Sequence, residues 1–151
     1  MILDQKVIVP AAPESVWDFV MDVSAVADCV PGVESVEQVS DDEYVGALKV
    51  RVGPIAVRLE GKVTVVERNA EEQRAQMNVE AVDRRIKGAV NAKSTMQLRA
   101  LDDGTTELAV HTDASILGKL GEFGQAIMRR KADQIMKEFA DNMSQRIQAE
   151  P

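Results

Sequence analysis

Few side chains in this sequence have the chemistry of a catalytic or metal-binding group. There is one histidine, His111, and one cysteine, Cys29, and they lie in distant segments. Zinc and iron sites need several convergent His, Cys, Asp or Glu ligands, so we predict no metal site. His111 falls beside Asp113 on the polar side of a predicted strand, where a solvated side chain is more common than a general base. Cys29 ends a short predicted helix, and we interpret it as a packing residue.

The remaining polar candidates do not form a general acid-base pair. Asp83, Arg84 and Arg85 stand together at the end of a predicted strand, where they could form a polar rim. Ser94 and Thr112 are the only hydroxyls that strand alternation places on the apolar side. We therefore predict no catalytic residue.

Three glycines recur at three-residue spacing, at Gly118, Gly121 and Gly124. They lack the spacing of a nucleotide-binding loop, so phosphate binding is a poor explanation for them. They open the segment 117–149, which contains no proline and whose apolar residues follow the spacing of a helix with one buried face. We predict one long C-terminal helix here. Each glycine costs a helix about 1 kcal/mol relative to alanine, so its first turns are expected to open locally.

The elements that precede this helix are predicted from alternation and from turn-forming residues. Residues 2–9 alternate as a strand, and residues 13–22 form a short amphipathic helix. A second helical piece spans 24–30, with Ser24 as its N-cap and Pro31-Gly32 as its end.

Between Val33 and Ser115 the pattern changes to alternation of polar and apolar residues. Turn-forming residues divide this region into six strands, with breaks at 40–42, 53–54, 69–72, 84–88 and 102–104. Because the breaks are short and contain no helix, consecutive strands are predicted to pair antiparallel as a meander. The predicted order is β-α-α-β-β-β-β-β-β-α, in a single domain of residues 1–151.

Alternation predicts one apolar and one polar face for this sheet. The apolar face carries large aliphatic residues but also several small ones: Gly61, Ala75, Ala81, Ala92, Ser94 and Ala114. Since a core is filled by large side chains, two interpretations remain open: the helix packs very close to the sheet, or a space lies between them. Flexible thioethers suit adaptable walls and favour a space; they occur at Met77, Met96, Met128 and Met136.

Charge and composition limit the kinds of partner. The formal net charge of -7 opposes binding to nucleic acid, which depends on clustered Lys and Arg. We recognise no signal peptide and no apolar run long enough for a membrane span, and a single cysteine fits a reducing compartment, so we expect a cytoplasmic protein. Arg129, Arg130 and Lys131 form one basic cluster, which is either a solvated helix surface or a contact for an anionic membrane surface or an acidic partner.

Four motifs along the chain resemble a known family. They are PxxVWxFxxD at 13–22, VADCVPGV at 26–33, YVGALKVRVGPI at 44–55 and LGKLGEFGQAIMRRKAD at 117–133. Together with the order of elements, they resemble the CoxG subunit of carbon monoxide dehydrogenase, of the START-like (SRPBCC) helix-grip superfamily. The resemblance covers nearly the whole chain. It implies an α+β helix-grip fold, in which a curved antiparallel sheet of about seven strands wraps around the long C-terminal helix and encloses an apolar cavity.

The resemblance also implies a function. The family is associated with molybdenum-containing carbon monoxide dehydrogenases and related hydroxylases, with their recruitment to the membrane, and with carriage of hydrophobic molecules that include isoprenoid quinones. For this chain it implies a non-enzymatic carrier of a lipid or isoprenoid quinone, with peripheral contact at the inner face of the membrane through Arg129, Arg130 and Lys131. We expect the mouth of the cavity at Gly118, Gly121 and Gly124, and its walls at Leu48, Val50, Leu59, Met77, Val79, Met96, Leu98, Phe123 and Ile127.

Two alternatives remain. One is an adaptor or assembly factor that docks on such a hydroxylase or brings it to the membrane, with a filled core and no ligand of its own. The basic cluster would then be its contact surface. The other is a cyclase-type or hydratase-type enzyme, which the same architecture also supports, and which would have to rely on the hydroxyls of Ser94 and Thr112.

Overall fold

The computed structural model describes residues 1–149. The strands are β1 (Ile2–Val9), β2 (Val33–Gln38), β3 (Glu43–Val52), β4 (Ile55–Asn69), β5 (Arg74–Asp83), β6 (Gly88–Ala100) and β7 (Thr106–Gly118). The helices are α1 (Pro13–Val20), α2 (Val23–Cys29), the short 3-10 helix η1 (Lys119–Phe123) and α3 (Gln125–Ala149). Apart from η1, this order of elements is the one that the sequence predicts.

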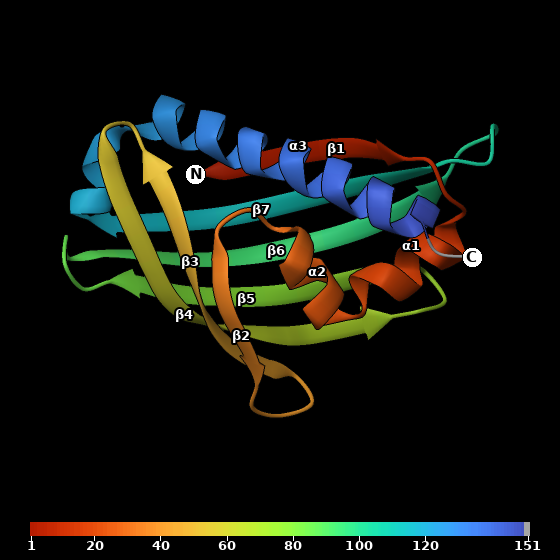
Figure 1. Ribbon diagram of the computed structural model, residues 1–151, viewed down its shortest axis with the longest axis horizontal. Helices are drawn as coiled ribbons and strands as arrows, with labels where there is room; N and C mark the ends of the chain where they lie inside the picture. The colour runs from red at the N-terminus through yellow and green to blue at the C-terminus, as the bar shows by residue number, and fades with distance from the viewer. Residues whose placement is uncertain (150–151) are drawn as a thin grey trace.

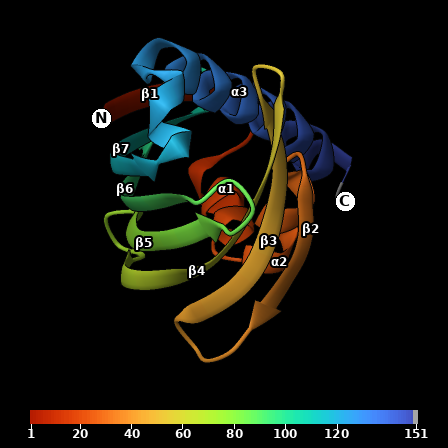
Figure 2. The same ribbon diagram turned by 90° about the vertical axis from the view of Figure 1, so that its left-hand side faces the viewer.

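All seven strands form one antiparallel sheet in the order β1-β7-β6-β5-β4-β3-β2 (Figure 1). Strands β2 to β7 pair in succession, which confirms the predicted meander, and β1 pairs with β7. The sheet curls strongly, and the helices lie on its concave side (Figure 2). Strands β1 and β2 are its two edges. Strand β1 runs beside α3, whereas no described strand pairs with the outer side of β2, whose register with β3 shifts between Val33 and Ser35.

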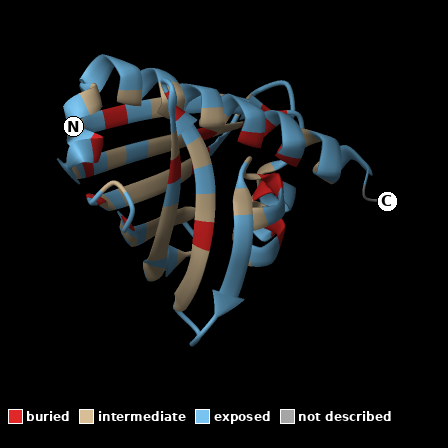
Figure 3. Cartoon of the chain, turned by 60° about the vertical axis from the view of Figure 1, so that its left-hand side comes forward, coloured by how far each residue is buried: buried red, intermediate tan, exposed pale blue. Residues whose placement is uncertain are grey.

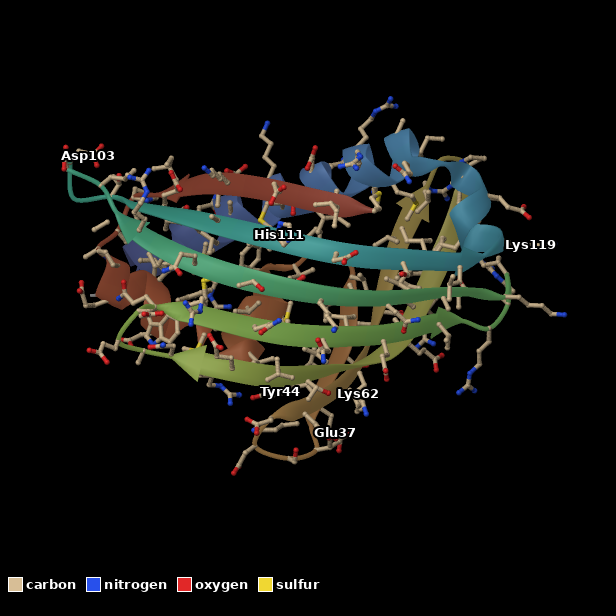
Figure 4. All side chains as sticks on the ribbon, turned by 180° about the vertical axis from the view of Figure 1, so that it is seen from behind. Glu37, Tyr44, Lys62, Asp103, His111 and Lys119 are labelled. Carbon is tan, nitrogen blue, oxygen red and sulfur yellow. The ribbon has the colours of Figure 1, made fainter. Side chains whose placement is uncertain are left out.

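The cross-strand register confirms the predicted division into an apolar and a polar face. Residues directly opposite each other share a face of the sheet, and the register places Leu48 opposite Leu59 and Ala92 opposite Ala114. On the other face, Lys49 lies opposite Arg58. The apolar residues line the concave side, toward the helices, and the charged residues cover the convex side (Figure 4).

Two glycines allow the sheet to bend where β3 meets β4. Gly46 and Gly61 lie directly opposite each other. A Cβ atom on Gly61 would lie 2.2 Å from the Glu80 carbonyl oxygen, and one on Gly46 would lie 2.3 Å from the Ser35 carbonyl oxygen. Both positions therefore exclude any side chain. The small residue at position 61 is explained by this close backbone approach and not by an unfilled core.

The two short helices close one end of the curl. Pro13 occupies the first turn of α1, as the sequence predicts, and the helix buries Val16 and Phe19. For α2 the predicted cap is wrong, because Asp22, and not Ser24, is the N-cap. The Asp22 carboxylate accepts a hydrogen bond from the Ala25 N–H at 3.2 Å, so α2 begins one residue earlier.

The C-terminal helix begins later than predicted. Strand β7 continues through Ile116 and Leu117 to Gly118, η1 follows, and α3 starts only at Gln125. At about 1.5 Å per residue, α3 is roughly 37 Å long. Its C-terminal half carries the buried side chains Phe139, Ala140 and Met143. Among residues 1–149, no helix combines the length and the apolar character that crossing a membrane requires.

Candidate functional site

The apolar interior consists of two separate clusters at opposite ends of the concave face. The first, which we call the helix-end cluster, joins α1, α2 and the C-terminal half of α3 to the sheet; its buried members are Val9, Val16, Phe19, Ala25, Cys29, Leu98, Leu108, Phe139 and Met143. The second, the hairpin-end cluster, lies where the β3–β4 hairpin meets η1; its buried members are Val52, Val57 and Leu120. Each end of the molecule is therefore packed on its own.

Between the two clusters lies a section of the sheet that belongs to neither. We call it the middle section; it comprises Met77 and Val79 on β5, Ala92 and Ser94 on β6, and Thr112 and Ala114 on β7. Cross-strand pairing places these six residues side by side on the concave face. Only Ala114 is buried, and Met77 is 38% exposed although it points inward. In Figure 3 these strands are mostly of intermediate burial in their central parts.

The spacing along the strands gives the size of the middle section. On β6, Met96 packs against the helix-end cluster and Val90 against the hairpin-end cluster. At about 3.3 Å per residue, these two positions are roughly 20 Å apart. The side chains between them on the concave face are only those of Ala92 and Ser94. On this stretch of β6, the concave face therefore carries very little side-chain volume.

The stretch of α3 between the two clusters also carries little side-chain volume. On α3, Met128 packs against the hairpin-end cluster and Met136 against the helix-end cluster. Between them the body-facing positions include Ala132 and Ile135, which are half-buried and belong to neither cluster. Ala132 is thus a small residue in the part of α3 that lies between the two clusters. Apart from Ala114, the inward-facing side chains of the middle section are thus left partly exposed to solvent.

A pocket of about 320 Å³ opens at the start of α3 beside β7. Gly121 and Gly124 line it together with Met128 and Ile116, and so does Ala114 of the middle section. Ala114 is thus the residue of the middle section that lies at this pocket. Two of the three glycines expected at the mouth are thus at an opening, whereas Gly118 does not line it.

A second groove, of about 460 Å³, runs between β1 and α3. Two polar contacts hold α3 to β1 along this seam. The Gln5 side-chain amide donates to the Asp133 carboxylate at 2.9 Å, and the Arg129 guanidinium donates to the Ile2 carbonyl oxygen at 2.6 Å. The N-terminal half of α3 is therefore held to β1 by hydrogen bonds of exposed side chains, whereas the C-terminal half carries the buried side chains of the helix.

The residues predicted to form the cavity walls fall into three groups. Met96 and Leu98 belong to the helix-end cluster or pack on it, and Val50, Leu59 and Phe123 pack on the hairpin-end cluster. The residues in neither cluster are Leu48, Met77, Val79 and Ile127, the last of which is 39% exposed on α3. The first two groups would form the ends of a cavity, and the last group its long sides.

The three glycines do not lie in the first turns of the C-terminal helix, so that prediction is wrong. Gly118 ends β7 with a φ of 68°, and Gly124 lies between η1 and α3 with a φ of 87°. Gly121 lies within η1, where a Cβ atom would be 2.7 Å from the Ile116 carbonyl oxygen. The glycines serve a sharp change of chain direction from strand to helix.

The described residues offer little acid-base or metal chemistry. No group of three or more His, Cys, Asp or Glu residues within 1–149 could hold a metal ion. The His111 ring lies on the convex face, away from the helices, with Nδ1 2.6 Å from an Asp4 carboxylate oxygen (Figure 4). Cys29 is fully buried, and burial raises the pKa of its thiol against the opposing effect of the nearby Arg146 guanidinium. The predicted packing role of Cys29 is confirmed by its place in the helix-end cluster.

The polar groups of the middle section are two hydroxyls. Ser94 Oγ and Thr112 Oγ1 are 2.8 Å apart and form a hydrogen bond between β6 and β7. The sequence places both on the apolar side, and the register confirms it. Sequence reasoning did not name Ala132, which lies on α3 between the two clusters, among the site residues. Its signal is a single small side chain within a helical stripe of Met128, Ile135 and Met136.

The family model for CoxG, described as a subunit of carbon monoxide dehydrogenase, matches residues 6–148. This chain belongs to that family. Among solved structures, a conserved protein from Geobacillus kaustophilus superposes with a TM-score of 0.89 at 21% sequence identity, covering 98% of this chain and 95% of that chain. A START superfamily protein from Mycobacterium smegmatis has a TM-score of 0.67 at 13% identity, with 97% of each chain covered.

The Zhui aromatase/cyclase from Streptomyces sp. R1128 is similar to the same degree in fold, with a TM-score of 0.67 at 16% identity, covering 98% of this chain and 93% of that chain. At these identities the similarity establishes the fold alone, which is START-like. No curated protein sequence matches this CoxG-family chain significantly.

Proposed function

We propose that this CoxG-family protein carries an apolar small molecule, a lipid or an isoprenoid quinone, between the middle section of the sheet and α3. The observation that carries the proposal is the separation of the interior into two packed clusters with a thinly filled stretch between them. Each methylene group removed from water contributes about 0.8 kcal/mol, so burial alone supplies affinity for a prenyl tail. Family membership supports an accessory role beside a carbon monoxide dehydrogenase-type hydroxylase, without catalysis by this chain.

The experiment fills the space. An Ala132→Phe substitution places a ring at a half-buried position of α3 between the two clusters. We expect it to weaken binding of a prenylated naphthoquinone at least about 10-fold while changing the free energy of unfolding by less than about 1 kcal/mol. In a tightly packed core the same substitution would destabilise the protein by about 1–3 kcal/mol. Binding is measured by native mass spectrometry and unfolding by urea titration.

The matched control is Ala126→Phe, on the same helix but exposed to solvent. It should leave both quantities unchanged. A wild-type protein that remains empty with every quinone and lipid offered would contradict the carrier role. So would an Ala132→Phe variant that binds as well as wild type.

A second candidate function is that of an adaptor for the hydroxylase or for the membrane. The observation that favours it is a set of basic side chains at the hairpin end of the molecule, which we call the basic end: Arg51, Arg84, Arg85, Lys87, Lys119, Arg129, Arg130 and Lys131. No ion pair among residues 1–149 involves any of these eight. Unneutralised positive charge fits an acidic protein surface or an anionic bilayer. A carrier must meet its client, so the two functions are compatible.

A further inference from the structure

The middle section contains a small polar site on an apolar floor. Ser94 and Thr112 lie directly opposite each other on β6 and β7. In the same cross-strand row, Met77 lies opposite Ser94 on β5, and Leu3 lies opposite Thr112 on β1. The hydroxyl pair is therefore flanked on both sides by apolar side chains. It lies midway between the two clusters, where we propose that the ligand sits.

The hydrogen bonds of this pair leave one donor unused. Two hydroxyl groups carry two hydrogens, and the 2.8 Å contact between Ser94 Oγ and Thr112 Oγ1 uses one of them. Within residues 1–149, neither hydroxyl makes a hydrogen bond to any other protein group. The hydroxyl that accepts within the pair thus keeps an O–H for another partner. Cross-strand register places that O–H on the concave side, toward α3.

We propose that this free O–H donates to a carbonyl oxygen in the ring of the bound ligand. This inference rests on the proposed carrier function and narrows its ligand class to apolar molecules that bear a hydrogen-bond acceptor, such as quinones and ketones. We expect the ligand to supply an acceptor for this O–H, because a donor that is buried without a partner is rarer and costlier than an acceptor with a spare lone pair.

A pure hydrocarbon of the same shape would cover the O–H without replacing its hydrogen bond. Such a loss lowers affinity by roughly 10-fold to 100-fold. A site that offers a hydrogen bond to one group rejects the analogue that lacks it more strongly than a purely apolar pocket could. In this proposal the hydroxyl pair favours ligands that carry a hydrogen-bond acceptor, whereas the apolar walls discriminate between ligands only by their size.

The test compares two probes on the full chain: a naphthoquinone with a prenyl tail, and the naphthalene hydrocarbon with the same tail. Wild-type protein should bind the quinone at least about 10-fold more tightly. In the double variant Ser94→Ala/Thr112→Val, which removes both hydroxyls with little change of shape, the two affinities should become equal because the hydrocarbon no longer covers a donor. Thr112→Ser retains a hydroxyl and should keep the preference.

The matched control is Thr95→Val, one residue along β6, where the side chain lies on the convex face opposite His111. It should leave the ratio of affinities unchanged. Equal binding of both probes by wild type, or a quinone preference that survives in the double variant, would overturn the inference and leave the carrier function standing. Binding of neither probe would instead overturn the carrier function. Each single variant, Ser94→Ala or Thr112→Val, leaves one O–H free and should keep the preference. If the double variant does not fold, Ser94→Ala/Thr112→Ala, which also removes both hydroxyls, provides the same decision.

Discussion

Asp83 is a nearly fully buried carboxylate, with 3% of its surface exposed. It lies at the end of β5 and accepts hydrogen bonds from three backbone N–H groups: from Arg58 on β4 at 2.8 Å, and from Arg85 and Ile86 in the following turn at 2.9 and 3.2 Å. Desolvation acts to raise the pKa of Asp83, but these donors outweigh it, so its pKa lies below the ordinary value for an aspartate. Asp83, which was expected in a polar rim, is instead buried and links β4 to the turn that follows β5.

Replacing Asp83 by Asn should destabilise the protein by about 1–3 kcal/mol at pH 7, because an amide oxygen cannot satisfy all three donors and its NH2 group faces one of them. A lowered pKa in the folded state means that the carboxylate stabilises the fold above its unfolded pKa. That contribution is lost as the pH falls through the folded pKa, below about 4. Urea unfolding at several pH values should therefore show the difference between wild type and variant shrinking on acidification.

The control for this prediction is Asp18→Asn on the exposed surface of α1, which should change stability by less than about 0.5 kcal/mol. A gap between wild type and Asp83→Asn that stays constant down to pH 3 would contradict the role of the ionised carboxylate.

At this scale the sequence predicts direction but not packing. Strand alternation correctly placed Leu48, Met77 and Leu98 on the concave face. It could not predict that Leu98 is buried in the helix-end cluster while Met77 remains exposed. This difference depends on which end of the sheet α1 and α2 cover. Alternation is a local property, whereas the site is defined by what distant segments leave unfilled.

The connection from β7 to α3 is the element whose structure departs most from the sequence prediction. Leu117, Leu120, Phe123 and Ile127 have helical spacing, and they mimic the first turns of a helix. In the structure Leu117 is in β7, Leu120 is the buried centre of the hairpin-end cluster, and only Ile127 is in α3. Single-sequence periodicity cannot detect backbone conformations that glycine alone adopts, so the strand, η1 and α3 merged into one predicted helix.

Gly118→Ala and Gly124→Ala distinguish the predicted continuous helix from the observed connection of β7, η1 and α3. The sign of their effect on the free energy of unfolding differs between the two. Within a helix each change would stabilise the protein by about 1 kcal/mol. The observed backbone angles, φ 68° and ψ -152° for Gly118 and φ 87° and ψ 155° for Gly124, belong to a region that is nearly restricted to glycine, so each change should instead cost about 1–3 kcal/mol.

The larger loss is expected for Gly118→Ala, since its Cβ would lie 2.1 Å from the Lys87 carbonyl oxygen, whereas a Cβ on Gly124 meets nothing within 4 Å. Gly124→Ala thus serves as the control that isolates backbone strain. Free energies of unfolding from urea titration provide the comparison. Stabilisation by either substitution would mean that a helix continues through these positions.

The molecule as a whole is electrically asymmetric. The basic end lies at one end of the sheet, and Figure 4 shows its Lys119 at the opposite extreme from Asp103 in the β6–β7 turn. At the same end of the molecule lie the β4–β5 turn and α1 (Figure 1), which carry further exposed carboxylates: Glu71, Glu72, Glu14 and Asp18. A protein with a net charge of -7 thus presents positive charge at one end, beside the pocket lined by Gly121 and Gly124.

Reversing charge at the basic end should separate docking from ligand uptake. In the triple variant Arg84→Glu/Lys119→Glu/Arg130→Glu, all three altered side chains are exposed. With about 1 kcal/mol per basic residue at an anionic surface, we expect affinity for phosphatidylglycerol vesicles to fall at least about 100-fold in a co-sedimentation assay. Capture of the hydroxylase in a pull-down should fall as well, while quinone binding is retained.

The matched control reverses three exposed lysines on the convex face, Lys49, Lys62 and Lys93, and so changes the net charge equally. It should leave co-sedimentation and pull-down far less affected. Equal loss in both triple variants would assign the effect to net charge and remove the basic end from consideration. Unchanged binding in both would remove the adaptor function through this surface.

The open sheet has a consequence for how copies of this protein behave at high concentration. Exposed strand edges are templates on which other chains add and grow into fibres. Here α3 lies along β1, while β2 is only six residues long, bulged between Val33 and Ser35, and bears the carboxylates of Glu34 and Glu37. Short length, a bulge and like charges each disfavour edge-to-edge addition. The sheet can thus remain open at both edges without acting as a template for aggregation.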